Sequence, residues 1–307
     1  MINELSLTTA IPVMNDLGKR RIPFLFIVDF LLNSAVVVPL SEINESELLY
    51  DFNNCSNFKF ENTLGADFYF DKYPISFENY ESKLNKIIKQ LKRGDSFLAN
   101  LSVCTKIETN LDLLTIFAAC QAKYKLYYKD RFVCFSPETF VQVRGNRIAS
   151  FPMKGTIDAN LPRAAEVILS DQKEAAEHAT IVDLIRNDLS MIAQKVWVAR
   201  YRYLDRIVTN QKALLQVSSE IAGQMPDNWR ETLGDWLFQL LPAGSISGAP
   251  KHRTLEIIKE AENYERGYYT GVSGIFDGEN LDSGVLIRFI ENTSDGLIFK
   301  SGGHYSP

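Results

Sequence analysis

An acid and an amine lie near the two ends of a predicted β-hairpin. The stretch ETFVQVRGNRIASFPMKGT contains two alternating segments around Gly145-Asn146, a dipeptide position typical of a tight hairpin turn. Glu138 stands at the start of this stretch and Lys154 near its end. Strand pairing is therefore expected to bring the two side chains together at the open end of the hairpin. They would then share one site, and an ordinary surface ion pair explains the same spacing.

Two carboxylates three positions apart form a second candidate site. The segment DQKEAAEHATIVDLIRNDLSMIAQ has the periodicity of a long helix, so Glu174 and Glu177 are expected on one face. Two carboxylates aimed at one point suit Mg²⁺, a hard cation that binds oxygen ligands and keeps several waters. A solvated acidic face is the alternative. The charged run at residues 183–188 would have to pair internally if it is buried.

A loop of small residues and a late arginine offer two further candidates. The segment GSISGAPK, residues 244–251, precedes a predicted helix, where small residues let a ligand approach and free N–H groups attract anions. Most loops of this composition are ordinary turns. The segment Tyr269-Thr270-Gly271 and Arg288 in VLIRF form a candidate carboxylate clamp, because arginine binds carboxylates bidentately. A structural ion pair of Arg288 is equally compatible with the pattern.

These groups depend on a succession of predicted strands and helices. Residues 1–75 are predicted to be strand-rich, because PFLFIVDF and SAVVVPL are β-branched and aromatic runs. A helix is predicted over residues 76–94, and further helices over LDLLTIFAACQAKY, ETLGDWLFQLLPAG and the segment after Pro250. No fixed-period repeat or linker separates the elements. The sequence therefore predicts one intertwined α+β domain over residues 1–307, with its core at 76–303.

Composition narrows the class of protein. The 307 residues are 46% hydrophobic and 23% charged, which is typical of a globular protein. The net charge of -5 gives no overall basic excess, so neither a nucleic acid nor a membrane is expected as a partner. The N-terminus lacks a basic signal region and the apolar stretch 22–40 is interrupted by polar residues, so a soluble, cytoplasmic protein is predicted. Four scattered cysteines and three histidines disfavour a disulfide scaffold and a zinc site.

Six motifs together resemble those of the chorismate-utilising enzymes. They occur in the family's order across roughly residues 76–303: SPETF, PMKGT, EHATIVDLIRNDL, AGSISGAPK, RGYYTGVSG and LIRF. The resemblance implies the family's α+β fold, with two large, mainly antiparallel β-sheets packed around the active site and helices outside. It also implies Mg²⁺-dependent chemistry on chorismate.

The motif at residues 152–156 distinguishes members of this family. Aminodeoxychorismate synthases carry P-I-K-G-T there and anthranilate synthases P-I-A-G-T, whereas this chain has Pro-Met-Lys154-Gly-Thr. Isochorismate and salicylate synthases have a water-activating lysine where this chain has Leu98. Gln216 replaces a family histidine linked to pyruvate elimination. The resemblance therefore implies an aminodeoxychorismate synthase component I, which makes 4-amino-4-deoxychorismate for p-aminobenzoate and folate synthesis.

The resemblance also implies a role for each site residue. Glu138 would be a general acid whose pKa is raised by burial, and Lys154 a neutral nucleophile whose pKa is lowered by desolvation and nearby Mg²⁺. Ammonia would then add at C4 and expel the lysine. Glu177 would bind Mg²⁺ directly and Glu174 through water. The implied substrate contacts are Gly155, Thr156 and Ser245 at the ring, and Tyr269, Gly271, Arg288 and Gly302 at the enolpyruvyl carboxylate.

A partner is expected, and two alternatives remain open. The sequence has no glutaminase-like Cys and His constellation, so a separate glutamine amidotransferase subunit is expected to supply ammonia. Family members continue into a final helix with two more metal-binding acids, whereas this sequence ends SGGHYSP, with His304 at a family glycine position. The alternatives are an anthranilate synthase component I and a folded chorismate-binding protein whose metal site is incomplete.

Overall fold

Two β-sheets carry the fold in the computed structural model, which describes residues 2–53, 55–59, 67–208 and 212–306. The first has nine strands in the order β11-β13-β10-β9-β15-β14-β1-β2, with β12 also paired to β13. Their bounds are β1 (Phe24–Val28), β2 (Ala35–Pro39), β9 (Thr139–Arg144), β10 (Arg147–Ser150), β11 (Met153–Asp158), β12 (Lys195–Val208), β13 (Ala213–Gln224), β14 (Val272–Phe276) and β15 (Leu281–Val285).

The second sheet has eight strands in the order β4-β3-β7-β8-β16-β17-β6-β5. The described pairings within both sheets are antiparallel, so the expected α+β class with two antiparallel sheets is confirmed. The strand bounds are β3 (Leu48–Phe52), β4 (Cys55–Ser56), β5 (Phe70–Tyr73), β6 (Ala99–Thr109), β7 (Tyr124–Tyr128), β8 (Phe132–Ser136), β16 (Phe289–Thr293) and β17 (Gly296–Tyr305).

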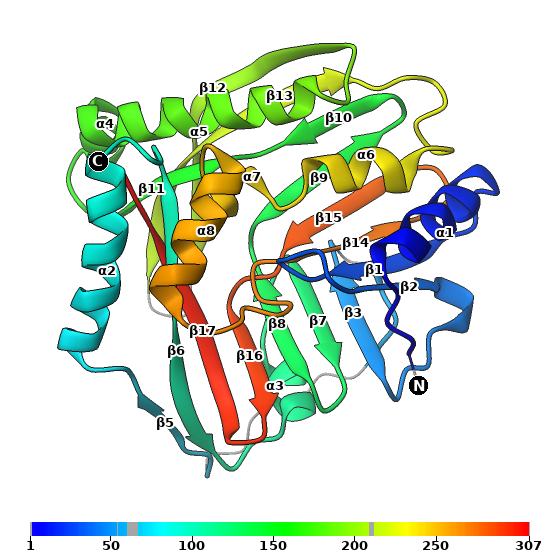
Figure 1. Cartoon of the computed structure of the whole chain (residues 1–307), viewed down its shortest axis with the longest axis horizontal. Coiled ribbons are helices and arrows are strands. Elements are labelled where there is room, and N and C mark those ends of the chain that lie inside the picture. Colours follow the sequence, from blue (N-terminus) through cyan, green and yellow to red (C-terminus); the bar gives the residue numbers. More distant parts are fainter. Residues whose placement is uncertain (1, 54, 60–66, 209–211, 307) are drawn as a thin grey trace.

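Helices lie around the two sheets (Figure 1). Three of them begin at side-chain caps, because Ser76 accepts a hydrogen bond from the Asn79 N–H, Asp112 from the Thr115 N–H and Asp171 from the Glu174 N–H. None of the helices in the described ranges is long and apolar enough to span a membrane. The helix bounds are α1 (Leu7–Lys19), α2 (Phe77–Lys92), α3 (Leu113–Ala119), α4 (Ala164–Ser170), α5 (Gln172–Ser190), α6 (Leu233–Leu240), α7 (Gly244–Ser247) and α8 (Lys251–Glu262), with a 3-10 turn at Leu40–Glu42.

Strand β1 shows how the layers share one core. Phe24, Phe26 and Val28 pack into the cluster that contains helices α1, α5 and α6, whereas Leu25 and Ile27 pack against strands of the second sheet. Successive side chains of a strand point to opposite faces, so both faces of β1 are buried. This explains why the run FLFIV is apolar throughout rather than alternating.

Helix α1 was not expected from the sequence. The predicted strands at PFLFIVDF and SAVVVPL are present as β1 and β2, but a helix at Leu7–Lys19 precedes them. Its buried side chains at Ala10, Met14 and Leu17 recur every three or four residues, which is helical spacing. The description of residues 1–75 as strand-rich therefore missed an amphipathic helix that covers the first sheet.

We expect Gly18→Ala to destabilise the protein. A Cβ atom at Gly18 would lie 2.1 Å from the backbone oxygen of Arg230. Alanine normally favours a helix over glycine by about 1 kcal/mol, but the clash should lower the free energy of unfolding by roughly 1–3 kcal/mol. Urea unfolding measures this, with Lys19→Ala on the exposed face as the control. A Gly18→Ala protein more stable than wild type would contradict this packing of α1.

Candidate active site

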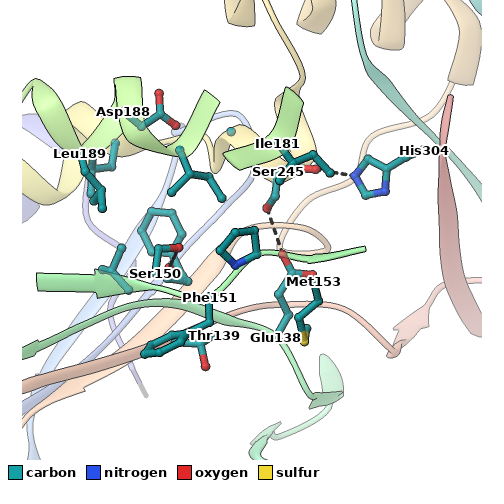
Figure 2. Close-up of a pocket in the computed structure, with 16 residues that line it drawn as sticks. Glu138, Thr139, Ser150, Phe151, Met153, Ile181, Asp188, Leu189, Ser245 and His304 are labelled. Carbon is teal, nitrogen blue, oxygen red and sulfur yellow. Dashed lines mark hydrogen bonds between the residues drawn. The ribbon is translucent and has the colours of Figure 1, made fainter. Parts of the chain in front are cut away.

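Glu138 is fixed just before β9 by both its backbone and its side chain. Its backbone oxygen accepts a hydrogen bond from the Val285 N–H at 3.1 Å, which ties it to β15. The Ser245 hydroxyl on α7 donates to Glu138 Oε1 at 2.9 Å (Figure 2). The predicted small-residue loop therefore supplies a contact to the predicted acid.

Burial controls the protonation of Glu138. Glu138 is partly exposed as a whole residue. Burial of its carboxyl group nevertheless raises the pKa of that group, and the hydrogen bond from Ser245 opposes the rise without cancelling it. A carboxylic acid with a raised pKa keeps its proton further toward neutral pH. Glu138 is therefore suited to donate a proton.

The structure corrects the hairpin argument for Lys154. Strands β9 and β10 pair with Arg144 opposite Arg147, as expected, but the chain then leaves the hairpin at Pro152. Strand β11 pairs with β13, which lies between β11 and β10. Proline has no N–H to continue a strand ladder, which favours this departure. Hairpin pairing therefore does not place Lys154 opposite Glu138.

Lys154 instead forms an ion pair with Glu177 on helix α5. Lys154 Nζ lies 2.7 Å from Glu177 Oε2, and the two side chains are 18% and 15% exposed. Lys173 Nζ lies 3.9 Å from Glu177 Oε1, and Ser306 donates to the same oxygen at 3.1 Å. Burial raises the pKa of Glu177, but the hydrogen bond and charge of Lys154 outweigh it and leave the pKa lowered. Glu177 is therefore an ionised carboxylate held against an amine.

Glu174 lies beside the same pair. A Cβ atom at Gly155 would stand 3.0 Å from Glu174 Oε2, and Gly155 has a φ of +84°. The positive φ is what favours glycine here, since other residues rarely adopt this backbone conformation. The structure thus brings together four of the predicted residues: Lys154, Gly155, Glu174 and Glu177.

A cavity of about 270 Å³ lies on the other side of Glu138. Arg288 lines it from the turn between β15 and β16, with an exposed side chain and a φ of +55°. Arg288 therefore lies between two strands rather than within one, and its guanidinium has no ion pair among the described residues. The cavity's lining is Asn100, Glu138, Ile246, Tyr269, Thr270, Ile287, Arg288, Phe299, Lys300, Ser301, Gly302 and His304.

Four predicted substrate contacts lie outside this lining: Gly155 beside Glu174, Ser245 in contact with Glu138, and also Thr156 and Gly271. Thr156 is exposed on β11, opposite Gln216 of β13. Gly271 packs against the chain, because a Cβ there would stand 2.1 Å from the Val28 backbone oxygen. The geometry of the described residues gives Gly271 a packing role.

Sequence reasoning missed Asn100. Its side chain is 4% exposed, and its Oδ1 has no hydrogen-bond partner among the described residues. It lies opposite His304 in the pairing of β6 with β17, so the two side chains share a face. An asparagine within the otherwise apolar run FLANL was the signal that could have identified it.

A buried ion pair supports the wall that Asn100 belongs to. Arg266 and Glu262 are each 1% exposed at the side chain, and Arg266 Nε donates to Glu262 Oε2 at 2.8 Å. Arg266 also donates to the Asn100 backbone oxygen at 2.8 Å and to Thr270 Oγ1 at 3.1 Å. Breaking a buried pair leaves an uncompensated charge, so this wall resists distortion.

His304 lies near both Glu138 and the ion pair of Lys154 with Glu177. Its ring Nε2 contacts the Ser245 backbone oxygen, and the residue lines the cavity next to Glu138 (Figure 2). Burial lowers the pKa of its ring, and the charges of Lys154 and Glu177 also act on it. His304 therefore lies beside Glu138 and within electrostatic range of the Lys154–Glu177 pair.

A second, smaller cavity of about 50 Å³ also reaches Glu138. It lies between β9, β10 and helix α5, and Asp188 of the charged run lines it. Asp188 pairs at 3.0 Å with Lys251, which lies outside the run, so the expected internal pairing does not hold for this residue; Asp183 and Arg186 pair with each other at 3.1 Å on the surface. The lining is Glu138, Thr139, Phe140, Val141, Ser150, Phe151, Pro152, Met153, Ile181, Ile185, Asp188, Leu189, Leu240, Gly244, Ser245 and His304.

Glu174 and Glu177 are the carboxylates to compare with the needs of the expected Mg²⁺. No group of three or more His, Cys, Asp or Glu side chains in the described ranges converges to hold a metal. Mg²⁺ requires only one or two protein carboxylates when substrate and water complete its shell. Glu174 and Glu177 supply two, next to each other on α5.

Known proteins resemble this chain in sequence and in fold. The model of the family described as chorismate binding enzyme matches residues 43–304. An uncharacterized PabA-like protein of Pasteurella multocida is 47% identical over 300 residues, which cover 97% of this chain and 93% of that protein. Menaquinone-specific isochorismate synthase of Escherichia coli has the same fold, with a TM-score of 0.75 at 15% identity, covering 99% of this chain and 78% of that one.

More distant relatives have assigned names. Anthranilate synthase component 1 of Acetivibrio thermocellus is 34% identical over 238 residues, which cover 70% of this chain and 46% of that protein. Aminodeoxychorismate synthase component 1 of Bacillus subtilis is 28% identical over 242 residues, covering 75% of this chain and 51% of that protein.

The raised pKa of Glu138 predicts a pH-dependent stability difference. Above its ordinary value of 4.5, the unfolded chain loses this proton while the folded chain keeps it. The wild-type protein should therefore lose stability relative to Glu138→Gln as pH rises through this window. Urea unfolding between pH 4.5 and 8 measures the difference, with Glu81→Gln on the exposed face of α2 as control. A difference that stays constant with pH would contradict the buried-acid assignment.

Proposed function

The chain belongs to the chorismate binding enzyme family, and we propose that it is an aminodeoxychorismate synthase component I. The reaction converts chorismate and ammonia into 4-amino-4-deoxychorismate and water, for p-aminobenzoate and folate synthesis. The observation that carries the proposal is the lysine of the PMKGT motif, whose amine lies 2.7 Å from a carboxylate of α5. The aminodeoxychorismate synthase of Bacillus subtilis is among the relatives that support it. A cytoplasmic location stays a prediction from the sequence.

Arg288 is proposed to anchor the substrate. Its unpaired guanidinium lines the larger cavity together with Tyr269 and Gly302. An arginine binds a carboxylate with two parallel hydrogen bonds, which fixes orientation as well as charge. The enolpyruvyl carboxylate of chorismate would lie here, which places the ring toward Glu138 and Ser245.

Glu138 and Lys154 then act on the ring in the first half of the reaction. The Lys154 ammonium first loses a proton to solvent, and the resulting neutral amine forms a bond to C2 while the ring double bonds shift and the C4–O bond breaks. The leaving hydroxyl takes the proton of Glu138 and departs as water. The raised pKa of Glu138 supports this role, because the group must be protonated before the step.

Ammonia completes the reaction in the second half. Its nitrogen bonds to C4, the double bonds shift back, and the bond between C2 and Lys154 breaks. The new C4 ammonium gives one proton to the Glu138 carboxylate, which restores the acid for the next cycle. A glutamine amidotransferase subunit is proposed as the source of ammonia.

Glu177 and Glu174 are proposed to hold Mg²⁺. Their donor chemistry fits this hard cation, and Glu177 is kept ionised by its surroundings. The bound ion would withdraw charge from the ring carboxylate of chorismate. The chain's own contribution is to keep both carboxylates beside Lys154, through Gly155 and the capped start of α5.

Anthranilate formation is the second candidate. The Acetivibrio thermocellus anthranilate synthase shares more identity with this chain than the Bacillus subtilis enzyme does. Against it, this chain has Lys154 where anthranilate synthases carry alanine.

Product identification separates these activities. Purified protein is incubated with chorismate, Mg²⁺ and excess ammonium, and the products are resolved by chromatography and mass spectrometry. We expect aminodeoxychorismate. Anthranilate with pyruvate would instead establish the second candidate, and unchanged chorismate would reject both for this chain.

Replacing Lys154 should abolish amination. Lys154→Ala removes the nucleophile, and nucleophilic residues of this kind contribute at least about 10³-fold to the rate. Lys173→Ala is the matched control, because Lys173 also lies beside Glu177 but is 81% exposed. The rate of aminodeoxychorismate formation is the measurement. Equal rates in the two variants would refute the nucleophilic role.

Removing the His304 side chain should help chorismate bind. His304 lines the same cavity as Glu138, so in the proposed complex its imidazole competes with the chorismate ring for space beside this acid. His304→Gly is therefore expected to lower the KM for chorismate, with His252→Gly on the exposed face of α8 as the control. A higher KM in His304→Gly would mean that the imidazole itself binds substrate.

A further inference from the structure

Glu138 lies where two cavities of different size meet. The larger, of about 270 Å³, contains the unpaired Arg288, whereas the smaller encloses about 50 Å³. Glu138 and His304 line both. A reactant in either cavity therefore lies next to the same carboxyl group.

The smaller cavity cannot hold chorismate. One water needs roughly 10–15 Å³ of such space, so a cavity of about 50 Å³ takes only a few molecules of that size. It also contains no arginine or lysine to meet a carboxylate. Its occupant must be small and must lack a negative charge.

The walls also disfavour a cation. Most of the lining is apolar and includes Phe151, Ile181 and Leu189. The charge of Asp188 is already neutralised by Lys251, whose amine lies 3.0 Å from the carboxylate. Figure 2 shows Asp188 and Leu189 on the opposite side of the cavity from His304, with Ile181 between them. Placing an unpaired ammonium among such groups costs free energy, whereas a neutral molecule enters readily.

The uncharged hydroxyl of Ser150 can form a hydrogen bond with an occupant of the smaller cavity. Ser150 lines the cavity, and its hydroxyl proton is already donated to the Phe140 backbone oxygen at 2.9 Å. The Ser150 oxygen keeps lone pairs that accept a hydrogen bond. A small neutral molecule with N–H groups satisfies this oxygen and can still direct its own lone pair toward the larger cavity.

We propose that the smaller cavity holds the neutral ammonia that attacks C4 of the ring. From there the ammonia nitrogen forms the bond to C4 while the C2–Lys154 bond breaks, and the surplus proton passes to the Glu138 carboxylate. One carboxyl group thereby serves both reactants, since it faces both cavities. The inference rests on the proposed amination reaction and assigns its second substrate a separate binding site.

Size selection among amines tests this site. Ile181, which is 3% exposed, projects into the cavity from α5 (Figure 2). Ile181→Ala enlarges the cavity and should let methylamine replace ammonia, giving the N-methyl product by mass spectrometry. Ile181→Phe fills it and should raise the KM for ammonium about tenfold, the scale of discrimination for a small group in an apolar pocket. The KM for chorismate should stay unchanged in both.

A neighbouring residue provides the matched control. Val182 is buried on the same helix at 5% exposed but does not line the cavity. Val182→Ala removes a comparable amount of core packing, so it reports general loosening of α5. Circular dichroism and thermal unfolding establish that each variant is folded. If Ile181→Ala does not fold, Ile181→Val provides a milder enlargement of the cavity.

The outcomes separate the two claims. If wild-type protein forms no aminodeoxychorismate from ammonium, the proposed function fails and this inference fails with it. If wild type aminates chorismate but the Ile181 variants keep its KM for ammonium and its rejection of methylamine, only the ammonia site is refuted. The ammonia site is also refuted if Val182→Ala changes the selection between ammonia and methylamine as much as Ile181→Ala does.

Discussion

The ion pair between Lys154 and Glu177 is the interaction on which the site depends. It joins strand β11 to helix α5, and its 2.7 Å contact lies at mostly buried side chains. A part-buried amine and carboxylate must be paired, because either one alone would be costly to desolvate. Gly155 at positive φ follows Lys154 on the strand side, and the Asp171 cap begins α5 six residues before Glu177 on the helix side. Local backbone and capping features thus determine where the chemistry can occur.

The two reactive groups are kept in different electrostatic surroundings. Lys154 lowers the pKa of Glu177, while burial raises the pKa of Glu138. Two carboxyl groups of one site therefore differ in protonation, one as a metal-ligand candidate and the other as an acid. The strand order makes this separation, since β13 and β10 lie between β11 and β9. An acid and an amine adjacent in a hairpin would instead form a simple ion pair.

The sequence predicted elements better than it predicted their contacts. Helix α5 and the β9–β10 hairpin follow from local periodicity and turn residues, which need no tertiary information. The placement of Lys154 failed because pairing of β11 with β13 is a long-range choice that a single hairpin pattern does not contain. Arg288 and Asn100 share this limit: their roles depend on a cavity formed by segments far apart in the chain. Helix α1 was missed because the apolar strands after it dominated the composition of that region.

The most direct test of the account is whether chorismate becomes covalently attached to Lys154. The protein is incubated with chorismate and Mg²⁺ without ammonia, and its intact mass is measured, followed by peptide mapping. The account predicts a mass increase equal to chorismate minus water, located on Lys154 and lost when ammonium is added. Formation of aminodeoxychorismate from ammonium with no adduct on Lys154 under any of these conditions would contradict it.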